Sequence, residues 1–529
     1  MPPGKPAPKA LDPQVLACEF EHFLAGSRDA QVLEDGRVLF DLRQASYSIA
    51  GEHGKCLLHL WSAERNVVRR VLDCSSRNGA LKLTVRLFGQ ASPSSIEIVR
   101  AKDAQSPGTR RAARAQYEQL LQRVLEREFP RLTADPLRST ADLERSFSPV
   151  YARGLLRAGR SAFAVLGVNA NEPQAAVDGS LTFALLWLDH CRQHLAEKAH
   201  VEGLKLYVPR GCSDIVRERM AHLNHAAARF ELYELDEREH SVTPVDCHDR
   251  GNISTRLVHC VNQQAVRERF AASIARVMDA AAEGAATLAP SIDVAPLSAA
   301  EISFRVHGLE FARARWGADP RSFTASEEIV FGVGAAAHLL DAGSEPLFRQ
   351  MLQRICAERQ PEGDHCAPFY RMHPERWLES LVLRDVSVLD SRFSEAGPVY
   401  SQVPAFSASD RAMIDVLTLT REGRLAVIEL KADEDLHLPL QGLDYWARVQ
   451  WHHQRGEFQR FGYFPGVALS PDPPVLLLAG PALRVHPSTD AILRYISPDI
   501  DCTVAGLDER WREGVRVVFR KRRAGAAAA

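Results

Sequence analysis

The sequence predicts a multidomain protein of mixed α/β and α+β class. We expect an N-terminal antiparallel β module, a central Rossmann-like α/β unit and a C-terminal domain with the element order αβββαβ. A chain of 529 residues is too long for a single hydrophobic core. Short apolar segments between turn residues dominate the first hundred residues, and strand-like and helix-like segments alternate in the middle. Near the C-terminus, two strand-like segments that each carry an acidic residue flank a short turn with a glycine, which is typical of a hairpin.

Composition excludes several classes of protein. Hydrophobic residues make up 46% and charged residues 25% of the chain, and the net charge is −2, so no global positive field indicates a nucleic-acid partner. The ten cysteines form no CxxC pair, which favours free thiols in a reducing compartment. No secretory signal and no apolar run of ~18 residues is found. We therefore expect a cytoplasmic protein that does not span a membrane.

The N-terminal part is expected to be rich in β-strands. Residues 1–15 are Pro-rich and predict a disordered leader, and residues 16–110 predict the β module. Its apolar segments are punctuated by Gly, Ser and Asn, as in an antiparallel sheet. The strand-like segments are GRVLFDL, KCLLHLW, RNVVRRVLDC, ALKLTVRLF and SIEIVR.

Residues 111–283 predict the Rossmann-like unit with a leading helix. Its turns carry neither GxGxxG nor GxxxxGK[ST], so dinucleotide and P-loop binding are not supported. This unit and the β module are expected to select a substrate, sense a signal or bind a partner, either a second copy of the chain or another protein. Strands are expected at 163–168, 204–208 and 230–235, and helices at 112–129, 181–198, 213–224 and 263–282.

An Ala/Pro-rich segment, residues 284–299, is expected to be a linker. Residues 300–360 predict a small α+β connector with strands at 302–312 and 328–332 and a helix at 346–359. The C-terminal domain is expected at 361–523, followed by a short tail at 524–529. Its helices are expected at 374–385 and 439–454, and its strands at 399–406, 413–420, 424–432, 474–479 and 515–519.

The C-terminal hairpin places two acidic side chains face to face. The three-residue turn at 421–423 puts Gly423 at the left-handed position that such a loop requires. Cross-strand partners then sum to 844, so Asp415 and Glu429 are expected to lie opposite one another, with Cβ atoms ~5 Å apart. Apolar residues flank both, so unpaired charge there is costly. Two facing carboxylates suit one shared cation, Mg²⁺ or Mn²⁺ by ligand type.

Lys431 is expected on the same face as Glu429, because side chains alternate along a strand. The chain has nine lysines among 65 Lys and Arg residues, and Lys431 is the only lysine between Lys205 and Lys521. Such a lysine can orient or deprotonate an attacking water, or offset charge in the transition state. Gln441 and Tyr445, four residues apart, share one face of the next helix, with Gln441 in its first turn.

This constellation resembles the PD-(D/E)XK nuclease superfamily, in the branch related to the RecB nuclease domain and the NucS-type endonucleases. The likeness rests on Ile414-Asp415, Glu429-Leu430-Lys431 and Gln441…Tyr445, within about residues 370–523. It implies a restriction-endonuclease-like domain in which Asp415, Glu429 and the Leu430 carbonyl bind the metal and Lys431 is catalytic.

The resemblance also implies a metal-binding glutamate on the helix that precedes these strands. Glu375 and Glu379 both qualify, four residues apart on one face, and Glu379 is favoured. A different interpretation is a buried ion network in a degenerate, nuclease-like domain.

The expected function is hydrolysis of phosphodiester bonds in nucleic acid, with DNA favoured, through in-line attack by a metal-activated water in repair or defence. The alternative is a catalytically inactive nuclease-like protein that binds DNA or serves as a scaffold in such a complex.

Overall fold

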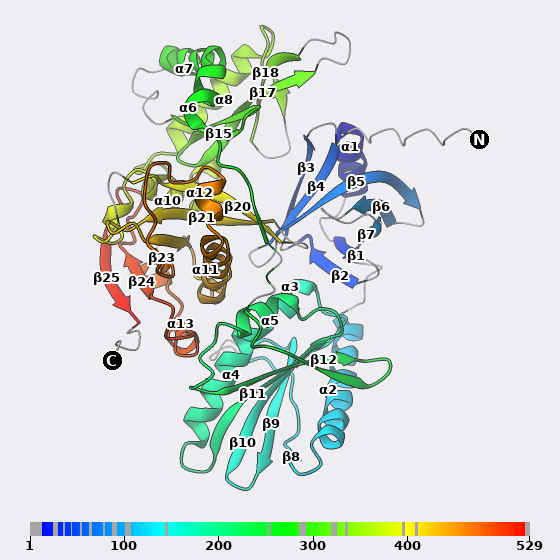
Figure 1. Ribbon diagram of the computed structural model, residues 1–529. Helices are drawn as coiled ribbons and strands as arrows, with labels where there is room; N and C mark the ends of the chain where they lie inside the picture. Colours follow the sequence, from blue (N-terminus) through cyan, green and yellow to red (C-terminus); the bar gives the residue numbers. More distant parts are fainter. Residues whose placement is uncertain are drawn as a thin grey trace, which may run out of the picture.

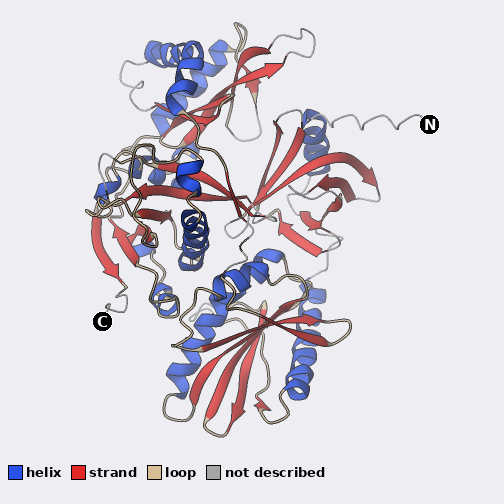
Figure 2. Ribbon diagram, viewed as in Figure 1, coloured by secondary structure: helices blue, strands red, loops and turns tan. Residues whose placement is uncertain are grey.

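The fold is described from a computed structural model. The structure describes residues 13–523 except 25–29, 35–36, 44, 53–54, 63–65, 78–79, 87–92, 101–106, 143–146, 251–252, 254, 285–291, 319–324, 334–336, 394–396 and 408–410. The described strands form four sheets, of seven, six, seven and five strands, so the chain is a mixed α/β protein with several sheets (Figure 2). No helix in the described part of the chain is long and apolar enough to cross a membrane.

The N-terminal sheet is antiparallel, with strand order β2-β1-β7-β6-β5-β4-β3. Helix α1 (Pro13–Leu24) contributes Leu16, Phe20 and Phe23 to its core at helical spacing. Residues 13–15 are therefore helical rather than part of a leader, and the rest of the expected leader and the tail at 524–529 lie outside the described residues. The strands are β1 (Ala30–Glu34), β2 (Arg37–Asp41), β3 (Ser46–Glu52), β4 (Lys55–Trp61), β5 (Asn66–Arg77), β6 (Ala80–Arg86) and β7 (Ser94–Arg100).

The central sheet is mixed, with strand order β13-β12-β11-β10-β9-β8. Its strands β10, β11 and β12 are parallel neighbours joined through α4 and α5, as parallel pairing requires a crossover. Helix α2 covers the opposite face (Figure 1). The elements are α2 (Pro107–Glu128), β8 (Thr133–Ala134), β9 (Tyr151–Ala158), β10 (Ser161–Val168), α3 (Gln174–Asp178), α4 (Ser180–Leu195), β11 (His200–Pro209), α5 (Asp214–Met220), β12 (Arg229–Asp236) and β13 (Ser241–Val245).

The five-stranded sheet corrects three sequence predictions. Residues 292–298 of the expected linker form its first strand, which pairs with β16. The expected strand at 302–312 is a hairpin that turns at His307 and Gly308, both with positive φ. The expected helix at 263–282 packs here, not on the central sheet, because its apolar residues join this core. The elements are α6 (Gln263–Arg269), α7 (Ala271–Gly284), β15 (Ile292–Ser298), β16 (Glu301–Val306), β17 (Leu309–Ala318), β18 (Ala325–Phe331), β19 (His338–Leu339) and α8 (Glu345–Glu358).

The C-terminal sheet has the order β14-β20-β21-β22-β23-β24-β25. Its edge strand β14 comes from residues 255–257, which the sequence places in the central unit. The expected order αβββαβ is present in α10, β20, β21, β22, α11 and β23. The elements are β14 (Thr255–Leu257), α9 (Pro368–Arg371), α10 (Pro374–Val382), η2 (Val386–Val388), β20 (Tyr400–Ser407), β21 (Arg411–Leu419), β22 (Leu425–Leu430), α11 (Leu438–Gln454), α12 (Glu457–Arg460), β23 (Val475–Pro481), η3 (Ala482–Arg484), α13 (Thr489–Leu493), β24 (Cys502–Leu507) and β25 (Val517–Arg522).

The C-terminal sheet is buried on both faces. The core on one face includes residues of α11 and is continuous with that of the central sheet, whereas the core on the other face includes α10. A parallel centre of this kind requires apolar residues on both sides, and all six residues of β22 are buried.

The buried Arg359 ties the five-stranded sheet to α10. Its guanidinium donates hydrogen bonds to the carbonyl oxygens of His307 (2.9 Å), Met372 (2.6 Å) and His373 (3.3 Å) and lies 4.7 Å from the ring centroid of Trp377. These contacts fix the position of the helix that carries Glu379.

Candidate metal-dependent active site

The hairpin of β21 and β22 has the register predicted from the sequence. Val416 pairs with Ile428 and Leu417 with Val427, which aligns Asp415 with Glu429. The turn is closed by Gly423, whose φ is 78°. Asp415 lies at the point where the ladder to β22 ends.

Asp415 connects three elements of the site. Its Oδ2 accepts a hydrogen bond from the backbone N–H of Leu430 at 3.2 Å, which holds the carboxylate against β22. Its Oδ1 accepts from Gln402 Nε2 at 3.3 Å, on the neighbouring strand β20. The charge of Asp415 raises the pKa of both Glu379 and Glu429.

Glu429 is only 1% exposed, at the end of β22. Burial, followed by the charge of Asp415, raises its pKa well above the usual value, and the neighbouring Lys431 only partly opposes this. Helix α11 packs closely against Glu429 near its N-terminal end, because a Cβ added to Gly442 would lie 3.7 Å from the Glu429 Cβ. Glu429 is therefore a buried acid whose ionised form requires a nearby positive charge.

Lys431 supplies one such charge. Its Nζ lies 3.4 Å from Glu429 Oε1 and 3.6 Å from Asp435 Oδ2. Burial lowers its pKa, but Glu429 and then Asp435 outweigh burial, and the net pKa is raised. A lysine with a raised pKa stays an ammonium group, so this environment favours charge stabilisation over the alternative role of deprotonating water.

Glu379 is the acid that α10 brings to the cluster. It is 4% exposed, and its Oε2 accepts hydrogen bonds from Arg376 at 2.9 Å and from Gln402 Nε2 at 3.1 Å. Burial raises its pKa, Arg376 opposes the rise and Asp415 adds to it. Because Gln402 also donates to Asp415, Glu379 is linked to the hairpin, whereas the structure records no such link for Glu375.

Gln441 and Tyr445 lie on α11, which packs on β22 and β23. Gln441 is 6% exposed in the first helix turn, next to Gly442. Tyr445 is half-buried one turn later and is close enough to Arg376 to contribute to the electrostatic environment of that guanidinium. Both predicted residues thus lie on the helix that borders Glu429.

Sequence reasoning missed Gln402 and Arg376. Arg376 precedes Glu379 by one helical turn, so a basic residue at this spacing was an available signal. Gln402 carried none, because a glutamine with a φ of 50° inside a strand is not suggested by any local pattern.

The carboxylates fit a hard divalent cation by donor chemistry. Among the described residues, no group of three or more His, Cys, Asp or Glu side chains is already arranged as a metal site. Yet Glu379 Oε1 and Glu429 Oε2 are buried atoms with no hydrogen-bond partner within the described part of the chain. A buried carboxylate oxygen without a donor is expensive, and a cation relieves that cost. Asp415, Glu429, Glu379 and the Leu430 carbonyl are the residues that would hold it.

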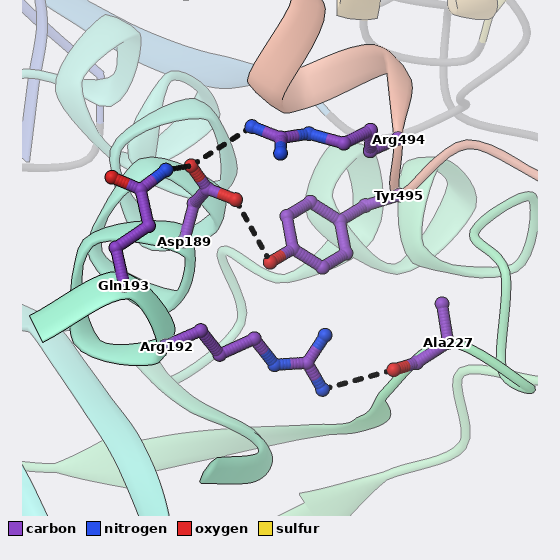
Figure 3. A pocket seen from close by; sticks show the side chains of 6 residues that line it. All are labelled: Asp189, Arg192, Gln193, Ala227, Arg494 and Tyr495. Atoms are coloured by element: carbon purple, nitrogen blue, oxygen red, sulfur yellow. Dashed lines mark hydrogen bonds and ion pairs between the residues drawn. The ribbon is translucent and has the colours of Figure 1, made fainter. Parts of the chain in front are cut away.

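A separate cavity of about 470 Å³ lies between α4 and α13 (Figure 3). Its polar groups bind each other, since Asp189 accepts hydrogen bonds from Gln193 at 2.7 Å, Arg494 at 3.0 Å and Tyr495 at 3.4 Å. Arg192 donates to the Ala227 carbonyl oxygen at 2.9 Å. This cavity lies between the central unit and the C-terminal domain, and none of its lining residues belongs to the carboxylate cluster.

Comparison with known proteins gives this chain no family. No family model matches it, and no curated protein matches it. Its function is therefore inferred from the carboxylates, from Lys431 and from the elements that hold them.

Proposed function

We propose that this protein is a divalent-metal-dependent nuclease that hydrolyses phosphodiester bonds in nucleic acid, with DNA as the favoured substrate. The observation that carries the proposal is the alignment of Asp415 with Glu429 across the hairpin, beside Lys431. A purely structural role explains this alignment poorly, because the charge of Asp415 raises the pKa of the buried Glu429, and a buried acid beside a second acid destabilises the fold unless a cation offsets the charge.

The chain's own residues have separable roles in this proposal. Asp415, Glu429, Glu379 and the Leu430 carbonyl bind Mg²⁺ or Mn²⁺, which when bound polarises a phosphoryl oxygen and lowers the pKa of a water. Lys431 remains charged and stabilises negative charge that develops on the phosphate.

The helix α11 presents Gln441 and Tyr445 at the border of the site, where polar groups can orient the substrate. Arg376 fits a phosphate contact, because its side chain is 41% exposed although one nitrogen is bound to Glu379.

We also propose a cytoplasmic location and partners for the N-terminal units. None of the nine cysteines that the structure describes forms a disulfide, which suits a reducing compartment. The N-terminal and central units would select the substrate or bind a second protein or a second copy of the chain.

The test is cleavage of plasmid and single-stranded DNA in Mg²⁺ or Mn²⁺. We expect cleavage by the wild type and a loss of ~100-fold or more in Asp415→Ala and Lys431→Ala. Asp433→Asn is the matched control, since Asp433 lies in the loop between β22 and α11 that also carries Lys431, and its side chain is 67% exposed. Equal cleavage by all four proteins, or none on varied substrates, contradicts the proposal. The second outcome supports the alternative of an inactive DNA-binding or scaffold protein.

A further inference from the structure

Gln402 has an unusual backbone conformation opposite a site residue. On β20, Ser401 pairs with Val416 and Val403 pairs with Ile414, so Gln402 faces Asp415 across the ladder. Its φ is 50°, in the left-handed region. A strand residue normally has a negative φ, so the chain departs from regular strand geometry at this one position of β20.

This conformation is costly for a glutamine. Glycine adopts a positive φ freely, whereas a side chain with a Cβ is strained there. Five described residues other than glycine have a positive φ, and the other four (His240, His307, His373 and Phe464) lie in turns or next to a helix. Gln402 is the one of the five inside a strand. Strain of this kind persists where the surroundings hold it in place, which is common at functional sites.

The side chain shows what the strain achieves. Gln402 Nε2 donates hydrogen bonds to Glu379 Oε2 at 3.1 Å and to Asp415 Oδ1 at 3.3 Å. These carboxylates come from a helix and a strand that are separate in sequence. One amide therefore fixes the distance and orientation between two acids of the cluster.

The chemistry of the amide matters as much as its position. An amide donates hydrogen bonds without adding charge, so it orients both carboxylates and leaves their negative charge for a cation. Arg376 already places one guanidinium on Glu379, and a second ammonium or guanidinium group at the position of the amide would compete further with that cation. With one oxygen of Glu379 engaged, the buried Oε1 is left with no hydrogen-bond partner among the described residues.

We propose that Gln402 is a positioning residue of the metal site, which its strained backbone places so that its amide pre-orients Glu379 and Asp415 for a divalent cation. The inference rests on the proposed function and extends it to a residue that does not touch the phosphate. Pre-orientation of ligands lowers the ordering that binding must otherwise impose.

Two substitutions separate the side chain from the strain. Gln402→Gly removes both, and Gln402→Met keeps the strained backbone and the side-chain length but removes the hydrogen bonds. His240→Gly is the matched control, because it relieves a similar φ of 54° in an exposed turn. The readouts are Mn²⁺ affinity by calorimetry, kcat and KM for DNA cleavage, and Tm without metal.

We expect Mn²⁺ affinity to fall about 10- to 100-fold in both Gln402 variants, the range that two hydrogen bonds to charged groups can supply. At fixed sub-saturating metal, kcat should fall and KM should stay nearly constant. The Tm of Gln402→Gly should equal or exceed that of the wild type, as should that of His240→Gly, which keeps wild-type metal affinity and cleavage.

Wild-type metal affinity and cleavage in Gln402→Gly would overturn the inference and leave the proposed function standing. Metal affinity that falls only in Gln402→Gly would also overturn it, since the strained backbone rather than the amide would then be responsible. A wild type that neither binds Mn²⁺ nor cleaves DNA would overturn the proposed function and this inference together.

Discussion

Arg219 and Asp444 form a bidentate ion pair between the central unit and α11, the helix that carries Gln441 and Tyr445. Arg219 Nε lies 3.0 Å from Asp444 Oδ1, and Arg219 Nη2 lies 2.9 Å from Asp444 Oδ2. The arginine side chain is 2% exposed. Because α11 is fixed from this side, the central unit helps to set the position of the two residues that border the carboxylate cluster.

Removing one member of this pair should destabilise the protein. Arg219→Met leaves Asp444 without its main cation, and we expect a loss of about 3 kcal/mol in the free energy of unfolding, measured by urea denaturation. The matched control is Arg217→Met. Arg217 is 3.8 Å from an Asp214 carboxylate that is 78% exposed, so its loss should change stability by less than about 0.5 kcal/mol. Equal effects of the two substitutions would contradict the prediction.

Glu218, next to Arg219 in the sequence, should make the stability of the protein sensitive to pH. Burial raises its pKa from 4.5 to about 7, Arg448 and Arg217 oppose the rise, and Asp444 and Asp214 add to it. A raised carboxyl pKa means that the folded state holds a proton that the unfolded state releases. Stability from this group is therefore complete below pH 4.5 and lost as the pH rises through 7.

The measurement is Tm between pH 5 and pH 8 for the wild type and Glu218→Gln. The substitution should flatten the fall in stability over that range, which for this group is at most about 3 kcal/mol. Glu197→Gln, at an exposed glutamate of the same unit, should leave the pH profile unchanged. A Glu218→Gln profile that keeps the wild-type slope would show that another group titrates.

Removing one buried acid should abolish the response to a divalent cation. A ligand that binds only the folded state stabilises it, by about 2.7 kcal/mol when its free concentration is ~100-fold above Kd. We expect Mg²⁺ to raise the Tm of the wild type and to have no effect on Glu429→Gln. The exposed turn residue Glu422 provides the control, because Glu422→Gln should respond as the wild type does. Chelation with EDTA should reverse the wild-type shift.

Arg376 should contribute to substrate binding more than to metal binding. Its guanidinium bonds Glu379 at 2.9 Å, yet its side chain is 41% exposed. Arg376→Gln should raise KM for DNA and reduce the slope of log affinity against log salt by about 1. Arg371→Gln, at an exposed arginine before the same helix, should change neither quantity. An unchanged salt slope in Arg376→Gln would exclude a phosphate contact.

Local rules were sufficient for the hairpin of the candidate site. The left-handed requirement at Gly423 and the period of two along a strand fixed the register that aligns Asp415 with Glu429. The positions of Glu379 and Gln441 on helices also followed from spacing. The register and these helical positions were predictable because each depends on residues close in the sequence.

Features that depend on distant contacts were not predictable. The linker expected at 284–299 contains β15, because the partner strand β16 and helix α6 pack against residues that look like a spacer in isolation. The hairpin within 302–312 was missed although Gly308 marked its turn. The amide of Gln402 reaches two carboxylates only after three elements have assembled, so no local pattern reveals it.

The short strand β14 has a consequence for how the chain is synthesised. Leu257 pairs with Ala405, so the edge of the C-terminal sheet leaves the ribosome long before its neighbour β20 does. The whole five-stranded unit emerges in between, and it can complete its own core first. Until β20 arrives, β14 is an unpaired strand, and β20 would in turn be an open edge in any fragment that begins after residue 257. The C-terminal sheet can thus be completed only after the five-stranded unit has emerged, because its strands β14 and β20 flank that unit in the sequence.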